Sequence, residues 1–240
     1  MCRNMLNFFP INRKPCKKVI YTAIFGDRDD LKPIRKQKGF DYYVFTDNPT
    51  LKHPVLKTKI NKPVDSDPCR NARFVKINPH LVLPGYEYWI WIDANIAVER
   101  IDFDQLLERY LKNHDIALHK HPIRQCIYDE ASACREKGFD LPEKIDAQIT
   151  KYRDEGYPAD NGLCSTSILF RRNTDRMIDF NNLWWKELSK YSRRDQLSFN
   201  YLAWKHGFSY YEIPGHVRLE NVDGFRIYPH KMMHGQISKL

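Results

Sequence analysis

No stretch of this sequence is both long enough and apolar enough to cross a membrane, which takes about 18 apolar residues or more. The apolar run at residues 5–10 (MLNFFP) is also shorter than the core of a signal peptide. We therefore expect a cytoplasmic protein that is soluble or that touches a membrane only peripherally.

The sequence also lacks paired cysteine motifs and the common nucleotide-binding loops. Its six cysteines form no CxxC pair and no Cys/His zinc spacing, so without an export signal we expect reduced thiols. Neither GxGxxG nor GxxxxGK[ST] occurs, which argues against a Rossmann dinucleotide site and a P-loop. Internal repeats, low-complexity segments and obvious linkers are absent as well.

Acidic residues are outnumbered by basic ones. The 240 residues include 39 Lys and Arg against 30 Asp and Glu, which gives a net charge of +9. This excess suggests an anionic partner, and nucleic acid, a phosphorylated small molecule and a membrane surface all remain open. Because residues 1–20 hold five basic residues and no acid, we expect residues 1–17 to be a basic leader. It is either a solvated tail or a contact with a membrane surface.

The order of the predicted elements indicates an open α/β sheet. Apolar, β-rich runs predict strands at 18–25, 41–46, 86–92, 115–119 and 163–170. Helical patterns cover 31–38, 69–81, 102–113, 174–191, 195–206 and parts of 128–157, while the proline-containing segment 48–68 is predicted to be irregular. A hydrophobic content of 42% is enough for a sizeable core, so we expect one domain over residues 18–240.

The most informative motif is YWIWIDANI at residues 88–96. An apolar strand places Asp93 at the carboxyl end of a parallel sheet, where ligands bind in open α/β folds. A carboxylate there can hold a divalent cation that neutralises a diphosphate. Asp93-x-Asn95 resembles the DxD motif of nucleotide-sugar glycosyltransferases, with Asn95 in place of the second carboxylate. The alternative is that both residues cap the turn after a core strand.

A row of three basic residues precedes this strand. Arg70, Arg73 and Lys76 are spaced i, i+3, i+6, so they lie on one face of the predicted helix. Three cations on one face can bind a diphosphate through charge-assisted hydrogen bonds. A solvated helix face is the ordinary alternative.

The ends of the first two strands supply further candidates for nucleotide contacts: Thr22, Phe25, Gly26 and Asp47. Gly26 permits close backbone approach, and Asp47 can hydrogen-bond a base or a ribose. The alternative is that Gly26 and Asp47 only form turns.

Two later segments carry polar residues suited to a sugar or an acceptor. His121, Arg124, Asp129 and Glu130 follow a predicted strand and suit a hydroxyl-rich or anionic substrate, or form an exposed loop. The other segment opens a helix and contains Arg193, Arg194, Asp195 and Gln196. Asp195 is a good N-cap, the two arginines beside a helix N-terminus attract phosphate, and the Asp-Gln pair suits sugar hydroxyls.

Together these segments resemble the TOD1/MUCI70-like (DUF616) glycosyltransferase domains, from about residue 18 to about residue 205. The matching stretches are YTAIFGDRDDL (21–31), RNARFVKINPHLVLPGYEYWIWIDANI (70–96), HPIRQCIYDEA (121–131), IDAQITKYRDEG (145–156) and SRRDQLSFNYLAW (192–204). The combination is far more specific than a single DxD.

The resemblance implies a GT-A-like fold, with a mixed, mostly parallel central sheet flanked by helices. It implies transfer of a sugar from a nucleotide-diphosphate donor, with UDP as the expected nucleotide, to a glycan or glycoconjugate hydroxyl. It assigns Asp93 to the donor phosphates, and the sugar or acceptor to the residues His121, Arg124, Gln148, Asn161, Arg193, Arg194, Asp195 and Gln196. Surface polysaccharide or glycan synthesis is the expected setting.

One departure from the family pattern concerns the cofactor. The plant members tend to have lysine at the position of Asn95, and a lysine can replace a metal by its own charge. An asparagine cannot, so we expect Mn²⁺ or Mg²⁺ here. Residues 230–235 (HKMMHG) loosely resemble the HxxG region of the GT8 family, which makes His234 a candidate third ligand beside Asp93 and Asn95. A histidine-rich surface tail is the alternative.

The stereochemistry of the transfer stays open at this point. Inversion requires a carboxylate base, for which Asp129, Glu130 and Asp195 are candidates. Retention lets the departing phosphate oxygen take the proton, and the family resemblance favours it. Nucleic-acid binding is the first alternative function, but the tryptophans and tyrosines fall mostly on apolar faces, so we expect no nucleic-acid partner. Binding of a glycan without catalysis is the other.

Overall fold

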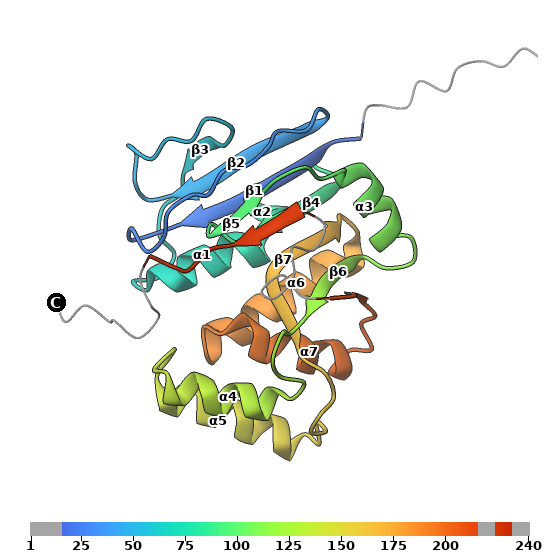
Figure 1. The fold of residues 1–240 in the computed structure, drawn as a ribbon. Coiled ribbons are helices and arrows are strands. Elements are labelled where there is room, and N and C mark those ends of the chain that lie inside the picture. Colours follow the sequence, from blue (N-terminus) through green and yellow to red (C-terminus); the bar gives the residue numbers. More distant parts are fainter. Residues whose placement is uncertain (1–15, 216–223, 232–240) are drawn as a thin grey trace, which may run out of the picture.

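The main structural element is a twisted, seven-stranded sheet (Figure 1). A computed structural model describes residues 16–215 and 224–231. In spatial order the strands are β3 (Lys57–Ile60), β2 (Phe40–Thr46), β1 (Lys18–Ile24), β4 (Tyr88–Ile92), β7 (Cys164–Arg172), β6 (Ile116–Lys120) and β8 (Tyr211–Ile213). Strand β7 runs antiparallel to both of its neighbours, and the remaining pairs are parallel. This confirms the expected mixed, mostly parallel sheet.

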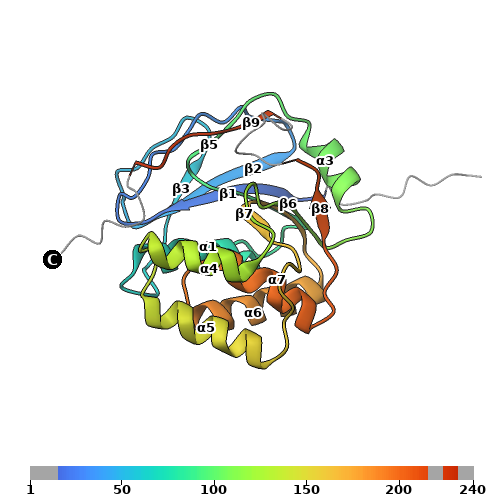
Figure 2. The same ribbon diagram turned by 60° about the horizontal axis from the view of Figure 1, so that its bottom comes forward.

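Helices cover one face of this sheet, and a smaller layer covers the other (Figure 2). The first layer contains α1 (Pro68–Ile77), α4 (Ile127–Glu136), α5 (Pro142–Asp154), α6 (Asp175–Lys190) and α7 (Asp195–Lys205), and α2 (Pro79–Val82) follows α1. The second layer contains α3 (Phe103–Tyr110) and a two-stranded sheet of β5 (Ile96–Val98) and β9 (Phe225–Ile227).

Both faces of the central strands are therefore buried. Along β1, Val19 and Tyr21 belong to the core under the helical layer, whereas Ile20 belongs to the core under the smaller layer. This explains why β1 and β4 are continuously apolar instead of alternating between polar and apolar residues.

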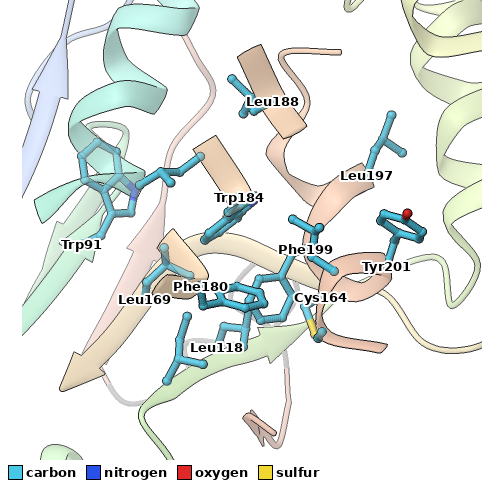
Figure 3. Packing of buried hydrophobic residues seen from close by; sticks show 14 of the residues in the cluster. Trp91, Leu118, Cys164, Leu169, Phe180, Trp184, Leu188, Leu197, Phe199 and Tyr201 are labelled. Atoms are coloured by element: carbon cyan, nitrogen blue, oxygen red, sulfur yellow. The ribbon is translucent and has the colours of Figure 1, made fainter. Parts of the chain in front are cut away.

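The larger core fixes the position of α7. Figure 3 shows Trp184 of α6 packed beside Phe199 of α7, and their ring centroids lie 5.2 Å apart. The indole nitrogen of Trp184 also donates to the backbone carbonyl of Asp195, at 3.2 Å, and to the Ser198 hydroxyl, at 3.1 Å. A buried aromatic residue thus anchors the first turn of α7 to the core.

Helix α1 has a well-defined start and end. The Asp67 side chain accepts a hydrogen bond from the backbone N–H of Cys69, and Pro68 occupies the first helical position. The helix ends at Ile77, since Pro79 cannot continue it. Its basic residues face inward, so Arg70 and Lys76 are buried. The alternative of a solvated basic face is therefore wrong for these two residues.

The main differences from the expected elements lie in short segments. Residues 31–38 form no helix, and within them Ile34 makes a single bridge to Val98. The segment 48–68, which was expected to be irregular, contains the edge strand β3. Strands β5, β8 and β9 were not predicted because each has only three residues, too few to show a periodic pattern.

Some expectations concern residues that the structure does not describe. Residues 1–15, most of the expected leader, are among them, so its contact with a membrane stays a prediction. In the described ranges, no helix combines the length and apolar character needed to cross a bilayer. The five described cysteines are free thiols: Cys16, Cys69, Cys126, Cys134 and Cys164.

The loop after β1 depends on a glycine. Gly26 has φ +63°, and its backbone N–H lies 3.2 Å from each carboxylate oxygen of Asp47 at the end of β2. A Cβ atom at this position would lie 2.8 Å from Cγ of Pro68, the first residue of α1. Only glycine therefore satisfies both the backbone conformation and the close approach of α1.

We predict that Gly26→Ala lowers the free energy of unfolding by about 2–3 kcal/mol, because backbone strain adds to a steric clash. Urea denaturation measures this loss. Gly156→Ala is the matched control, since Gly156 has φ +79° but no heavy atom lies within 4 Å of a Cβ there. We expect it to cost about 1 kcal/mol. Equal losses in the two variants would contradict the clash with Pro68.

Candidate active site

The described residues line a cavity of about 640 Å³ at one edge of the main sheet. Strands β1, β4 and β6 end at this edge, and the antiparallel strand β7 begins there. The N-terminal turns of α1 and α7 and the segment after β9 complete the wall. The cavity thus occupies the carboxyl edge of an open α/β sheet, where such folds bind ligands.

A buried carboxylate forms the centre of one wall. Asp195, the first residue of α7, is 1% exposed. Its Oδ2 accepts a hydrogen bond from the Thr166 hydroxyl at 2.8 Å and lies 2.5 Å from Nζ of Lys76, while its Oδ1 lies 3.1 Å from Nε of Arg73. Burial alone would raise the pKa of Asp195, but the charges of Arg73 and Lys76 outweigh it and hold that pKa well below its usual range. Asp195 is therefore ionised at neutral pH.

Lys76 links this carboxylate to a second one. Its Nζ lies 3.7 Å from Oδ1 of Asp93, and that oxygen also accepts a hydrogen bond of 2.7 Å from the indole N–H of Trp91. The Lys76 side chain is almost completely buried, and burial lowers its pKa although Asp195 and Asp93 act in the opposite direction. Lys76 does not line the cavity itself, so it acts on a ligand only through these two acids.

The end of β4 offers two oxygen ligands for a divalent cation. Asp93 and Asn95 both line the cavity. The amide nitrogen of Asn95 donates to the backbone carbonyl of Tyr228 at 2.7 Å, so its oxygen is the side-chain atom that suits a cation. One or two protein oxygens together with substrate phosphates form the usual Mg²⁺ site at a nucleotide. The donor set therefore fits Mn²⁺ or Mg²⁺ shared with a diphosphate.

Among the described residues, side chains alone form no complete metal site at the cavity. One group of three His, Cys, Asp or Glu residues in this part of the chain has its ligand atoms within 4.8 Å of one another, and it consists of Cys126, Asp129 and Asp160. None of these three lines the cavity. A cation beside Asp93 thus depends on oxygen atoms from elsewhere.

A second acidic residue organises the opposite group of basic side chains. Glu130, 3% exposed, accepts a hydrogen bond of 2.8 Å from the guanidinium of Arg124. His121 Nε2 and Arg194 Nη2 each lie 3.6 Å from one of its carboxylate oxygens. Arg194 also donates to the Gln196 side chain at 2.8 Å. Glu130 therefore fixes three basic groups that line the cavity.

The segment after β9, which the sequence analysis noted only for His234, adds another residue to the site. Nδ1 of His230 donates to the Asp29 carboxylate at 2.5 Å, and both residues line the cavity. Lys231 pairs in turn with Asp27, at 3.1 Å. Because His230 and Asp29 are 201 positions apart, no local pattern could reveal their contact. Thr166 was also missed, because nothing in the sequence distinguishes it from other residues of the predicted strand.

Many of the predicted site residues do line the cavity: Phe25, Arg73, Asp93, Asn95, His121, Arg124, Glu130, Arg194, Asp195 and Gln196. They come from five separate stretches of the sequence. The alternative interpretation of Asp93 and Asn95, as residues that only cap a turn, does not account for their place in the cavity wall.

Two of the predicted donor-binding arginines are directed elsewhere. Arg70 donates to the backbone carbonyls of Leu188, at 2.6 Å, and Tyr191, at 2.7 Å, at the end of α6. Arg193 donates to the carbonyl of Phe139 at 2.9 Å. Neither lines the cavity, because both guanidinium groups bind backbone carbonyls of the protein, so their contact with the donor stays a prediction. Helix periodicity could not show which basic side chains would donate to the backbone carbonyls of neighbouring segments.

The residues at the ends of β1 and β2 also have structural roles. Thr22 is buried within the sheet, 3% exposed, and Asp47 binds the backbone of Gly26. Thr22, Gly26 and Asp47 do not line the cavity, whereas the neighbouring Phe25 does. They shape the loop beside the cavity and do not form its surface.

Three predicted catalytic or acceptor-binding residues lie outside the cavity. Gln148 is fully buried and donates to the Tyr152 hydroxyl at 2.7 Å. Asp129 and Asn161 are exposed away from the cavity. Asp129 is therefore unsuited to be the general base, because a base must reach the reacting hydroxyl. His234 lies outside the described residues, so its role as a ligand stays a prediction.

Comparison with known proteins identifies related chains. A family model described as "TOD1/MUCI70, glycosyltransferase-like domain" matches residues 10–212. The chain is 27% identical over 222 residues to the probable hexosyltransferase MUCI70 of Arabidopsis thaliana, covering 79% of this chain and 38% of that protein. It is 26% identical over 230 residues to the alkaline ceramidase TOD1 of the same plant, covering 80% and 49%. The chain thus spans less than half the length of either relative.

Solved structures with a similar arrangement include two glycosyltransferases. Mouse xyloside xylosyltransferase 1 matches with a TM-score of 0.46 and 9% identity, covering 82% of this chain and 84% of that chain. The bifunctional glycosyltransferase WbbM matches with a TM-score of 0.45 and 13% identity, covering 81% and 38%.

We predict that Asp195→Asn lowers the free energy of unfolding at pH 7 by about 3–5 kcal/mol, because Arg73 and Lys76 lose the partner of their buried charges. The pKa of Asp195 is depressed in the folded state, so its contribution is complete above the unfolded pKa of about 4 and is lost as the pH falls further. Urea denaturation across pH 7 to 3 should show the difference from wild type shrinking below about pH 4.

Asp129→Asn is the matched control for this experiment, since Asp129 is exposed and forms no ion pair with a basic residue among the described residues. We expect it to change the free energy of unfolding by less than about 0.5 kcal/mol at every pH. A difference between Asp195→Asn and wild type that stays constant down to pH 3 would contradict a depressed pKa.

Proposed function

The chain belongs to the TOD1/MUCI70 family of glycosyltransferase-like domains, and we propose that it transfers a hexosyl group from a UDP-linked sugar to a glycan or glycoconjugate hydroxyl. The observation that carries this proposal is the ionised Asp195 in the cavity wall, with Arg73 and Lys76 beside it. Such a carboxylate binds sugar hydroxyls, while Arg73, which lines the cavity, attracts phosphate. MUCI70, a probable hexosyltransferase, supports the same class of reaction.

The donor diphosphate fits the basic part of the cavity. Arg73 and Arg194 line it and can donate charge-assisted hydrogen bonds to phosphate oxygens. The N-terminus of α7 adds a favourable dipole, since Arg194 and Asp195 begin that helix. Asp93 and Asn95 would hold Mn²⁺ or Mg²⁺, which supplies further positive charge to the leaving diphosphate.

The transferred sugar is placed against Asp195 and Gln196. Both side chains line the cavity, and each is fixed by a neighbour, Asp195 by Thr166 and Gln196 by Arg194. Fixed acceptors of this kind distinguish hydroxyl groups by position. We assign the acceptor to the part of the cavity near His121 and Arg124, which are held by Glu130.

The charges of the acidic residues favour transfer with retention of configuration. An efficient general base has a pKa near the working pH, whereas the pKa of Asp195 is held well below its usual range. Glu130 is occupied by Arg124, and Asp129 lies outside the cavity. We therefore assign the proton of the acceptor hydroxyl to the departing phosphate oxygen. The acceptor oxygen bonds to the anomeric carbon, the bond from that carbon to the phosphate oxygen breaks, and protonated UDP leaves.

The other functions fit the site less well. Amide hydrolysis, which the name of the relative TOD1 denotes, calls for an activated water or nucleophile. In the described residues, no three His, Cys, Asp or Glu side chains form a metal site at the cavity. Nucleic-acid binding through stacked bases calls for exposed aromatic residues at the site, but Trp89, Trp91 and Trp184 are buried, and the exposed Trp204 does not line the cavity. Both observations favour the sugar nucleotide.

We predict that the purified chain, given Mn²⁺, an acceptor glycan and a panel of UDP-sugars, releases UDP and forms a glycosylated product with at least one donor. Arg73→Met should lower kcat/KM by about 10²–10³, because one cation that stabilises the leaving diphosphate is removed. Coupled UDP detection and mass spectrometry of the product measure the two outcomes.

Arg176→Met is the matched control, because Arg176 is exposed, lies on α6 and donates to the carbonyl of Gly207 away from the cavity. It should keep kcat/KM within about twofold. If the chain neither binds nor turns over any common UDP-sugar, the proposal is contradicted. Ceramide hydrolysis in place of sugar transfer would support the alternative activity.

A further inference from the structure

A lysine behind the wall of the cavity is placed like a counter-ion and not like a ligand-binding residue. The Nζ atom of Lys76 lies 2.5 Å from Asp195 and 3.7 Å from Asp93, although these acids come from different elements, α7 and the end of β4. Its side chain is 1% exposed and does not line the cavity. A ligand in the cavity therefore meets the two carboxylates but not the ammonium group between them.

The position of this ammonium group is fixed from behind. The backbone carbonyl of Lys76 accepts hydrogen bonds from the Tyr21 hydroxyl, at 2.9 Å, and from the guanidinium of Arg171, at 2.6 Å. Arg171 is completely buried in β7 and also pairs with the Tyr21 hydroxyl. The Lys76 side chain additionally approaches the ring of Trp91, with Nζ 5.6 Å from the centroid. The lysine is thus part of the core and not a mobile surface cation.

The charges around the two acids balance without any added ion. Asp93 and Asp195 contribute two negative charges, and Lys76 and Arg73 contribute two positive charges within 4 Å of them. A divalent cation placed at Asp93 must therefore approach the Lys76 ammonium at short range. In a poorly solvated site this repulsion offsets much of the attraction of a single carboxylate.

The number of protein ligands also indicates that the free chain holds a cation at Asp93 only weakly. Asp93 and Asn95 supply two oxygen atoms, whereas Mn²⁺ and Mg²⁺ usually take six ligands. The described residues provide no set of three His, Cys, Asp or Glu ligand atoms around this point. A diphosphate would supply both the missing oxygen ligands and the missing negative charge.

We propose that Lys76 is an internal counter-ion for Asp93 and Asp195, and that it makes cation binding at Asp93 conditional on a bound nucleoside diphosphate. This inference rests on the proposed function, because it requires the diphosphate to occupy the cavity. Binding of the free cation is weak, and the cation and the diphosphate strengthen each other's binding by the same factor, as linkage requires. Lys76 is a positioning residue, since it touches neither the sugar nor the diphosphate.

The first test measures Mn²⁺ binding to the full wild-type chain by electron paramagnetic resonance, with and without saturating UDP. We expect Mn²⁺ to bind the UDP complex of the chain at least tenfold more tightly than it binds the free chain. The Mn²⁺ held by free UDP is subtracted in this comparison. Calorimetric titration of UDP, with and without Mn²⁺, should give the same factor. If Mn²⁺ binds the free chain as tightly as it binds the UDP complex, the inference is overturned.

The second test removes the charge of the Lys76 side chain and keeps its volume. Lys76→Met should strengthen Mn²⁺ binding to the free chain at least tenfold and reduce the coupling to UDP, whereas Lys76→Arg should keep wild-type behaviour. Lys137→Met is the matched control, because Lys137 lines the cavity but, in the part of the chain that the structure describes, forms no ion pair with either acid. Thermal unfolding checks that each variant is folded, and Lys76→Gln, which also removes the charge, takes the place of Lys76→Met if that variant does not fold.

The outcomes separate this inference from the proposed function. No UDP binding to the wild-type chain under any condition would overturn both. UDP binding and sugar transfer that do not change with Mn²⁺ would leave the proposed function intact and overturn the inference. Equal Mn²⁺ affinities in the wild type, Lys76→Met and Lys137→Met would also overturn it, because a merely structural lysine would leave these affinities unchanged.

Discussion

The buried ion pair between Lys76 and Asp195 lies where the main elements of the structure meet. The two charged atoms are 2.5 Å apart, and both side chains are at most 2% exposed. Removing two charges from water is costly, so such a pair is tolerated only when close partners satisfy both groups. Thr166 and Arg73 satisfy the carboxylate, and Asp93 lies beside the ammonium group. The arrangement requires α1, α7, β4 and β7 to pack together, so the fold and the charge of the cavity depend on each other.

The antiparallel strand β7 holds both members of this pair. Near its start, Thr166 donates to Asp195 at 2.8 Å. Near its end, Arg171 donates to the backbone carbonyl of Lys76 at 2.6 Å. Trp184 of α6 adds a bond to the backbone of Asp195 from within the core. Because one strand contacts α7 at one end and α1 at the other, the relative position of the two helices is fixed by the central sheet.

The cavity therefore combines two kinds of acidic residue. Asp195 and Glu130 each accept from or pair with basic neighbours, which fixes their carboxylates, and the charges of Arg73 and Lys76 also hold the pKa of Asp195 well below its usual range. Asp93 is more open, at 21% exposure, and faces the position expected for a diphosphate. The proposed transfer of a sugar from a nucleotide rests on this combination of fixed acceptors for hydroxyl groups and basic residues for phosphate.

The sequence by itself determined the main strands, most of the helices and the two motifs that supply Asp93 and Asp195. Apolar runs, helix periodicity and the strand-to-Asp pattern are local signals, so they can be detected without the fold. Only the tertiary structure decided that Arg73 lines the cavity while Arg70 binds the end of α6, and that Asp129 and Gln148 lie outside it. It also decided the contact between Asp29 and His230 and the role of Lys76. These facts depend on which helix end, carboxylate or carbonyl lies nearest in space, and residue spacing along the chain contains no information about partners more than a hundred positions away.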